Sequence, residues 1–176
     1  MSALRSNQAD HEWFAVQSWA GREPLCAKHL VARGYDVFLP CYREQRRWSD
    51  RTKTIERALF AGYLFCRLHR DVVAKIISSP GVVRIVGNND GPLPISGHEV
   101  EAIQRIIEAR VTAQPWPYLQ IGQRVRVDTG PLRDMEGIVV MIKNRRRLVV
   151  SIAQLQRSVA VELDADCVTV SRARAR

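Results

Sequence analysis

The tripeptide Asp128-Thr129-Gly130 is a short pattern whose residue types could do covalent chemistry. Aspartic proteases carry the same tripeptide, but their mechanism needs two carboxylates that share one proton. This chain has a single copy, so catalysis would require a homodimer. Because Pro131 follows directly, the segment also fits the turn of a β-hairpin, and we favour the turn.

A second pattern, Cys66 followed by His69, has half the spacing of a structural zinc site. Such a site needs four converging ligands, and the sequence offers no matching second pair. The four cysteines and four histidines form no C-x-x-C motif and no cysteine–histidine nucleophile pair. We therefore expect reduced, mostly buried thiols, no metal and no cofactor. An enzyme that uses Asp128 or Cys66 is the remote alternative.

Positive charge is the stronger signal. The 176 residues include 27 Lys and Arg against 18 Asp and Glu, which gives a formal net charge of +9. A strongly basic protein attracts polyanions, so nucleic acid, or a machine built around it, is the favoured partner. The sequence has no apolar run long enough to span a membrane and no signal-peptide core near its N-terminus. We expect a soluble, cytoplasmic monomer.

Two basic segments could contact nucleic acid. The first, from residue 43 to 57, should be an extended hairpin with a tryptophan among its cations, and that ring adds a stacking surface which solubility does not require. Its candidate nucleic-acid contacts are Arg46, Arg47, Trp48, Arg51 and Lys53. The second segment lies between two later strands. Its possible phosphate contacts are Lys143, Arg145, Arg146 and Arg147. A solvated turn that protects a sheet edge explains this second segment equally well.

Strands and helices that could position these groups alternate over the first 110 residues. Aromatic and β-branched runs predict strands at residues 13–19, 35–42, 59–68 and 82–86. The apolar run 59–68 should be the central strand, whereas Pro40 favours an edge or a bulge for the strand that contains it.

Helices are expected at three places between these strands. Residues 24–33 carry apolar positions at helical spacing, and Asp71 can cap a helix that follows it. A third helix should start after Ser96, because Ser96 and Glu99 have the spacing of a capping box, and it should end near Arg110. The alternation predicts an α/β unit of about 110 residues.

The second part of the chain changes to short β-rich runs. Pro115 and Pro117 forbid regular helix and favour an extended, semi-stiff connector before it. The runs that predict five short strands of a small barrel are 124–128, 138–143, 148–152, 159–163 and 168–170.

Several segments together resemble the NusG family of transcription elongation factors and its specialised antitermination paralogues. They are WFAVQSW, LFAGYLF, SPGVVRIVG, PLPIS and GQRVRVDTGPLRDMEGIVV, of which the last resembles a KOW motif. The resemblance implies an α+β fold: a mixed or antiparallel sheet flanked by helices, linked to a five-stranded SH3-like KOW barrel. The expected organisation is a disordered N-terminus at 1–12, the sheet domain at 13–110, a linker at 111–119, the KOW domain at 120–171 and a basic tail at 172–176.

The resemblance also implies a non-enzymatic factor that binds the clamp helices of the largest catalytic subunit of RNA polymerase and suppresses pausing. By position, Phe60 is expected at the centre of that contact. The further candidates are Tyr63, Phe65, Gln17 and Trp19. Alternation along one strand would send Phe60 to the face opposite Tyr63 and Phe65, so we expect Phe60 at the interface and treat Phe65 as core.

In the family, the KOW barrel recruits partners, including a small-subunit ribosomal protein or the termination factor Rho. Where the general factor has an exposed phenylalanine, this chain has residues 153–157, so its candidate contacts are Leu155 and Arg157. This departure from the family pattern favours a specialised paralogue over the general factor. The alternative function is a free RNA-binding or ribosome-associated KOW protein.

Overall fold

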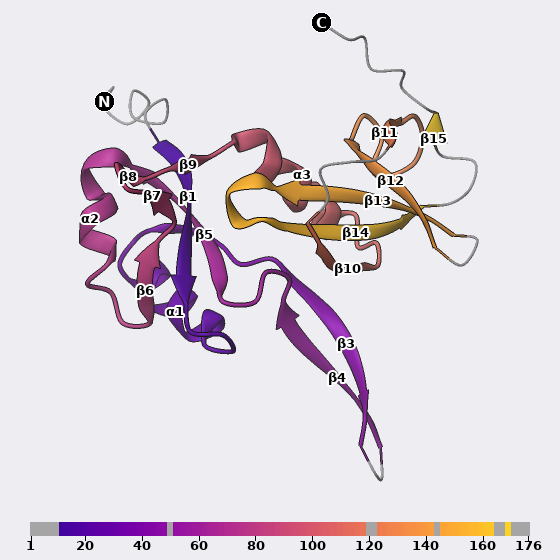
Figure 1. Cartoon of the computed structure of the whole chain (residues 1–176). Helices are drawn as coiled ribbons and strands as arrows, with labels where there is room; N and C mark the ends of the chain where they lie inside the picture. The colour runs from indigo at the N-terminus through magenta and orange to yellow at the C-terminus, as the bar shows by residue number, and fades with distance from the viewer. Residues whose placement is uncertain (1–10, 49–50, 119–122, 143–144, 164–167, 170–176) are drawn as a thin grey trace, which may run out of the picture. The chain divides into compact units, whose positions relative to one another are not determined.

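The computed structural model describes residues 11–48, 51–118, 123–142, 145–163 and 168–169 (Figure 1). The chain divides into two compact units, Met1–Gly97 and His98–Arg176. The basic tail at 172–176 and all but two residues of the N-terminus expected to be disordered lie outside the described residues. No helix in the described part is long and apolar enough to cross a membrane.

A five-stranded sheet organises the first unit, and all its described pairings are antiparallel (Figure 1). Its strands are β1 (His11–Ser18), β2 (Asp36–Phe38), β5 (Tyr63–His69), β6 (Val82–Ile85) and β9 (Pro94–Ile95). The order is β2–β5–β1–β6, with β9 also paired to β1. The strand predicted to be central is therefore central. The strand predicted over residues 35–42 is divided at residues 39–40, and its first part, β2, lies at the edge of this sheet.

The pairing of β1 with β5 decides which side chains face the helices. It runs over seven residues, from His11 opposite His69 to Gln17 opposite Tyr63. Alternation places Phe14 of β1 on one face, and the helices α1 (Glu23–Ala32) and α2 (Val73–Ile76) pack there. The core on this face comprises Phe14, Val16, Cys26, Leu30, Leu64, Cys66, Leu68, Val73, Ile76 and Ile85.

The start of the second helix differs from the prediction. A 3₁₀ turn, η1 (Arg70–Val72), precedes α2, so Asp71 lies inside the turn rather than before it. His69 is the cap instead, and its Nδ1 accepts the Asp71 backbone N–H at 3.3 Å. The prediction of Asp71 as the cap was wrong because the turn begins one residue before it.

Two hairpins complete the first unit. The strands β3 (Cys41–Arg47) and β4 (Thr52–Ala58) form a separate two-stranded sheet that projects from the unit (Figure 1). The strands β7 (Gly87–Asn88) and β8 (Gly91–Pro92) form a short hairpin.

The second unit is a six-stranded sheet in the order β10–β14–β13–β12–β11–β15. Its strands are β10 (Ala113–Pro117), β11 (Gln123–Val127), β12 (Glu136–Ile142), β13 (Arg145–Ile152), β14 (Arg157–Leu163) and β15 (Val168–Thr169). All five predicted strands are present. The described pairings do not close the sheet into a ring, so the SH3-like barrel stays a prediction.

The expected linker contributes the sixth strand. The strand β10 pairs with β14 over five residues at the edge of the sheet, with Pro115 and Pro117 exposed. Trp116 packs against a cluster of Ile138, Val149 and Ala160. The division between the units falls before residue 98, ahead of the expected linker, because α3 (Gly97–Glu108) makes its contacts with the second unit.

The helix α3 confirms the third predicted helix but not its capping box. Instead of returning to the backbone of Ser96, the Glu99 carboxylate accepts the Ala153 N–H at 3.3 Å. Burial raises the pKa of Glu99, and the Ala153 hydrogen bond opposes that shift.

A buried hydrogen bond ties the turn before β5 to the first turn of α1. The Gly62 N–H donates to Glu23 Oε1 at 2.6 Å, and the Ser18 N–H donates to the Gly62 carbonyl at 2.9 Å. Glu23 is buried, and Gly62 has a φ of +83°, which glycine adopts without strain. This bond fixes where the strand β5 begins.

We expect Glu23→Ala to lower the free energy of unfolding by about 1–3 kcal/mol, because the buried Gly62 N–H loses its acceptor. Urea denaturation of the full chain measures the change. Lys28→Ala on the exposed side of the same helix is the matched control and should stay within about 0.5 kcal/mol of the wild type. Equal effects of the two variants would contradict a structural role for the carboxylate.

Candidate interaction surfaces

The sheet face opposite the helices of the first unit carries an aromatic cluster. The Phe38 and Phe65 rings stack with centroids 6.1 Å apart, and Trp13 meets Phe38 edge-on at 6.4 Å. Phe60 meets Phe65 edge-on at 5.6 Å. These separations are those of attractive aromatic pairs, so the four rings form one connected cluster.

The prediction that Phe60 and Phe65 lie on opposite faces is wrong. The strand begins only at Tyr63, and the left-handed conformation of Gly62 turns the chain just before it. Alternation therefore does not extend back to Phe60, and its ring reaches the Phe65 face. Phe65 is in the core, as predicted, but Phe60 is also buried, with 1% of its surface exposed, rather than presented at the surface.

One end of this face is polar and more accessible. Gln17 pairs with Tyr63 on β5 and with Arg84 on β6, so these three side chains form a row across three strands. The Arg84 Nε–H donates to Gln17 Oε1 at 2.6 Å. Trp19 follows at the end of β1 with 70% of its surface exposed. Sequence reasoning missed Arg84 because the pairing of β6 with β1 cannot be read from local composition.

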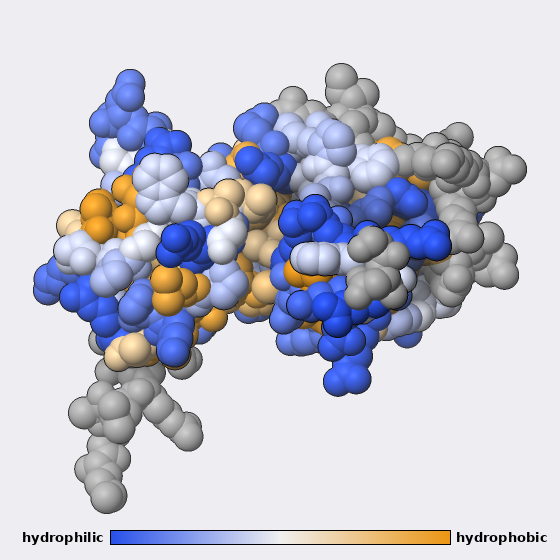
Figure 2. Space-filling view, turned by 90° about the horizontal axis from the view of Figure 1, so that it is seen from below, coloured by the Kyte–Doolittle hydropathy of each residue, from blue (hydrophilic) through white to orange (hydrophobic). Residues whose placement is uncertain are grey.

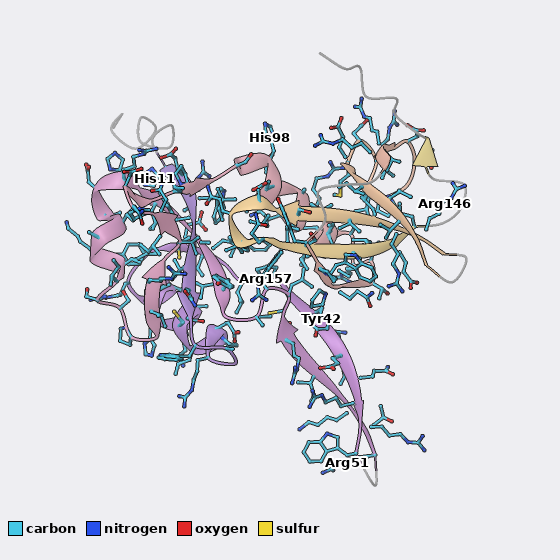
Figure 3. All side chains as sticks on the ribbon, in the orientation of Figure 1. His11, Tyr42, Arg51, His98, Arg146 and Arg157 are labelled. Carbon is cyan, nitrogen blue, oxygen red and sulfur yellow. The ribbon has the colours of Figure 1, made fainter. Side chains whose placement is uncertain are left out.

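The basic hairpin has a charge gradient from root to tip. Near its middle, Glu44 pairs with Arg57 at 3.0 Å and with Arg46 at 3.5 Å. Closer to the tip, Arg46 lies opposite Lys53. Two like charges in a cross-strand pair repel each other, and the Glu44 carboxylate, shared with Arg57, lies near this pair. Figure 3 shows Tyr42 near the root of the hairpin and Arg51 at its far end.

The hairpin register divides the candidate contacts between two faces. Arg46, Trp48 and Lys53 share one face, whereas Arg47 lies on the other. Trp48 is 56% exposed. Its backbone N–H donates to the Arg51 carbonyl at 2.8 Å, which holds Trp48 at the start of the tip. Figure 2 views the molecule from the side toward which the hairpin points, and hydrophobic residues reach that face only as patches among hydrophilic ones.

In the second unit, the predicted partner contact Leu155 is mostly buried in this structure. It ends a 3₁₀ turn, η2 (Ala153–Leu155), and only 8% of its surface is exposed. Gln156 then adopts a left-handed φ of +49° and directs the chain into β14. Arg157, the other candidate, is exposed at the start of β14.

Of the four candidate phosphate contacts in the second unit, the structure describes the side chains of Arg146 and Arg147. Lys143 lies outside the described residues, as does the side chain of Arg145, whereas Arg146 is exposed. Arg147 pairs with Glu162 at 3.0 Å and lies over the Trp116 ring at 5.4 Å, with 17% of its side chain exposed. Arg147 therefore stabilises its own sheet, and its prediction as a phosphate contact is not supported.

Of the two patterns with catalytic resemblance, one lies in a turn and the other on a strand. Asp128 is exposed in the turn between β11 and β12, where the Arg133 N–H donates to the Gly130 carbonyl, as the hairpin interpretation predicted. Cys66 and His69 point to opposite faces of β5, so they cannot bind one ion together. Among the described residues, no three His, Cys, Asp or Glu side chains are placed to hold a metal ion.

The described thiols are poor nucleophiles. Burial, with smaller contributions from Cys26 and Asp36, raises the pKa of Cys66 to about 12. Burial, with the nearby charges of Glu56 and Glu23, raises the pKa of Cys41 to about 11. Burial, followed by the charge of Glu23, also raises the pKa of Cys26. These shifts all favour the protonated thiol over the nucleophilic thiolate at neutral pH.

The chain thus combines an antiparallel sheet with an aromatic face, a projecting basic hairpin and a second, β-rich unit. The family model described as transcription termination factor nusG matches residues 11–104. That match covers more than half of the chain, which therefore belongs to the NusG family.

Relatives and a solved structure agree with this assignment. The chain is 28% identical over 165 residues to the transcription termination/antitermination protein NusG of Helicobacter pylori J99, with 86% of this chain and 94% of that protein covered. It is 29% identical to the corresponding protein of Escherichia coli K12 over 166 residues, covering 86% and 92%. The structure of Thermotoga maritima NusG, solved for its domain interaction, matches the fold with a TM-score of 0.58 at 21% identity, covering 93% of this chain and 99% of that one.

We expect the native protein at pH 8 to alkylate Cys66 roughly a thousandfold more slowly than the urea-unfolded chain, because its pKa of about 12 leaves little thiolate. Mass spectrometry of iodoacetamide-labelled peptides measures each cysteine separately. The slowing at Cys41 should be smaller, since its pKa is about 11. Similar rates in the native and unfolded states would show that the Cys66 thiol is accessible and ionised.

Proposed function

We propose that this protein is a transcription elongation and antitermination factor that binds RNA polymerase in the cytoplasm and makes or breaks no covalent bond itself. The observation that carries the proposal is the match of residues 11–104 to the NusG family model. Relatives named transcription termination/antitermination protein NusG cover nearly the whole chain and support the same role.

The docking surface that we propose for the polymerase clamp helices is the polar, accessible end of the aromatic face. Trp19 is its exposed aromatic side chain, and Gln17 and Tyr63 lie beside each other on the neighbouring strands. Interfaces of this kind draw most of their binding energy from a few aromatic side chains. Phe60 and Phe65 support the surface from inside, and they contact a partner directly only in a state that uncovers them.

Binding of this kind changes elongation through a population shift. A factor that binds the closed-clamp polymerase more tightly than the open, paused form lengthens the time that the enzyme spends elongating. Only the difference between the two affinities matters, so a factor that bound both forms equally would not suppress pausing.

We propose that the basic hairpin contacts DNA or RNA of the transcription complex. The excess of cations near the tip, with Arg46 opposite Lys53, supports a phosphate contact, and the exposed Trp48 ring on the same face supports base stacking. Arg51 belongs to the same tip, while Arg47 would contact phosphates only from the opposite face.

The second unit is the proposed recruiting module for a further partner, such as a ribosomal protein or Rho. Arg157 and Arg146 are the exposed cations that support this role, at the beginning of β14 and near the beginning of β13. Because Leu155 is buried, its part is to hold the turn between these strands rather than to contact the partner.

Trp19→Ala should weaken binding to core RNA polymerase by about 2 kcal/mol, roughly 30-fold, because it removes the exposed aromatic anchor. Titration of full-length variants against nucleic-acid-free core polymerase measures the change. Trp48→Ala is the matched control, because it removes an exposed tryptophan from the hairpin instead.

Phe60→Ala separates docking from folding in the same experiment. It should lower the free energy of unfolding by about 3–5 kcal/mol, because it leaves a cavity beside Phe65. If Trp19→Ala bound like the wild type, the proposed docking surface would be wrong. A wild-type protein that ignored polymerase yet bound RNA would favour the free RNA-binding or ribosome-associated alternative.

We expect the double variant Arg46→Ala, Lys53→Ala to reduce affinity for single-stranded DNA or RNA and to lower the salt slope of binding by about two phosphate contacts. Fluorescence anisotropy between 50 and 200 mM salt measures both quantities. Trp48→Ala should cost about 1–3 kcal/mol with little change in slope. The control is Arg43→Ala, on the other hairpin face opposite Glu56, and an equal effect there would contradict a site at the tip.

A further inference from the structure

The row formed by Tyr63, Gln17 and Arg84 joins three strands on the face opposite the helices. It directly follows the row in which Ala15 pairs with Phe65, and both of those residues are buried. The face thus changes from an aromatic interior to a polar border with an exposed arginine. Protein interfaces commonly have this arrangement, with an apolar centre, a polar rim and enrichment in arginine.

The positive charge of Arg84 is not neutralised by an ion pair within the described residues. Its Nε–H donates to Gln17 Oε1 at 2.6 Å. Because the glutamine is neutral, the contact orients the guanidinium without neutralising it. Arg70, at the opposite end of the β1–β5 pair, differs in this respect, since its Nε–H donates to the Glu12 carboxylate at 2.6 Å.

The orientation also leaves the two terminal NH2 groups of the guanidinium available to donate hydrogen bonds. An arginine that is held through Nε can still donate from its two terminal nitrogens, which match the two oxygens of a carboxylate. A long side chain that is already oriented loses less conformational entropy when it binds. Gln17 therefore acts as a positioning residue for Arg84.

We infer that Arg84 is a specificity-determining residue of the docking surface and binds a carboxylate of the partner protein, in an orientation set by Gln17. The inference rests on the proposed polymerase binding and adds the chemistry of the partner, which is an acidic side chain. The exposed, uncancelled guanidinium at the rim of an aromatic sheet face favours a protein carboxylate over a phosphate, because phosphate binding does not require an apolar neighbour.

The test is binding of full-length variants to core RNA polymerase free of nucleic acid. Arg84→Glu should weaken binding about tenfold at low salt, because it places like charges together, and the loss should shrink at 0.5 M salt. Gln17→Leu should weaken binding less, because it frees Arg84 without removing its charge. Arg70→Glu is the matched control and should bind within about twofold of the wild type.

Each outcome decides between the inference and the proposal on which it rests. Equal losses for Arg84→Glu and Arg70→Glu would overturn the inference and leave the proposed function intact, since they report only on net charge. A loss that appears only when nucleic acid is added would assign Arg84 to phosphate and overturn the carboxylate. A wild-type protein that does not bind polymerase would overturn both. Circular dichroism of each variant confirms that it is folded.

Discussion

The antiparallel pairing of β1 with β5 is the constraint on which the first unit depends. Because side chains alternate along a strand, seven paired residues fix two different faces at once. One face takes Phe14 and Leu64 into the core beneath the helices, and the other carries the aromatic cluster around Phe65. A shift of one residue would exchange the two faces, so the register specifies both the core and the surface that we propose for docking.

Much of this architecture follows from local sequence. The apolar run ending at Leu68, the proline before β3 and the short β-rich runs after residue 122 predicted the central strand, the edge strand and five strands of the second unit. These signals are strong because they depend on residue type and spacing within a few positions.

The errors arose where a distant residue sets local geometry. Phe60 was assigned to the wrong face because Glu23, 39 residues away from Gly62, fixes the turn that ends the alternation. Leu155 looked like a loop residue, but the left-handed Gln156 tightens the turn and buries it. Arg84 was overlooked because its orientation depends on a hydrogen bond to Gln17 in another strand. Composition and periodicity hold no information about such pairings.

The prolines of β10 have a consequence for the protein at high concentration. An edge strand normally exposes unpaired backbone N–H groups with which another chain can pair, and such edges promote self-association. The backbone N–H groups of residues two apart in a strand point to the same side of that strand. Pro115 and Pro117 are two apart, and neither has a backbone N–H to donate. The outer edge of β10 therefore gives a neighbouring copy few backbone donors with which to extend the sheet.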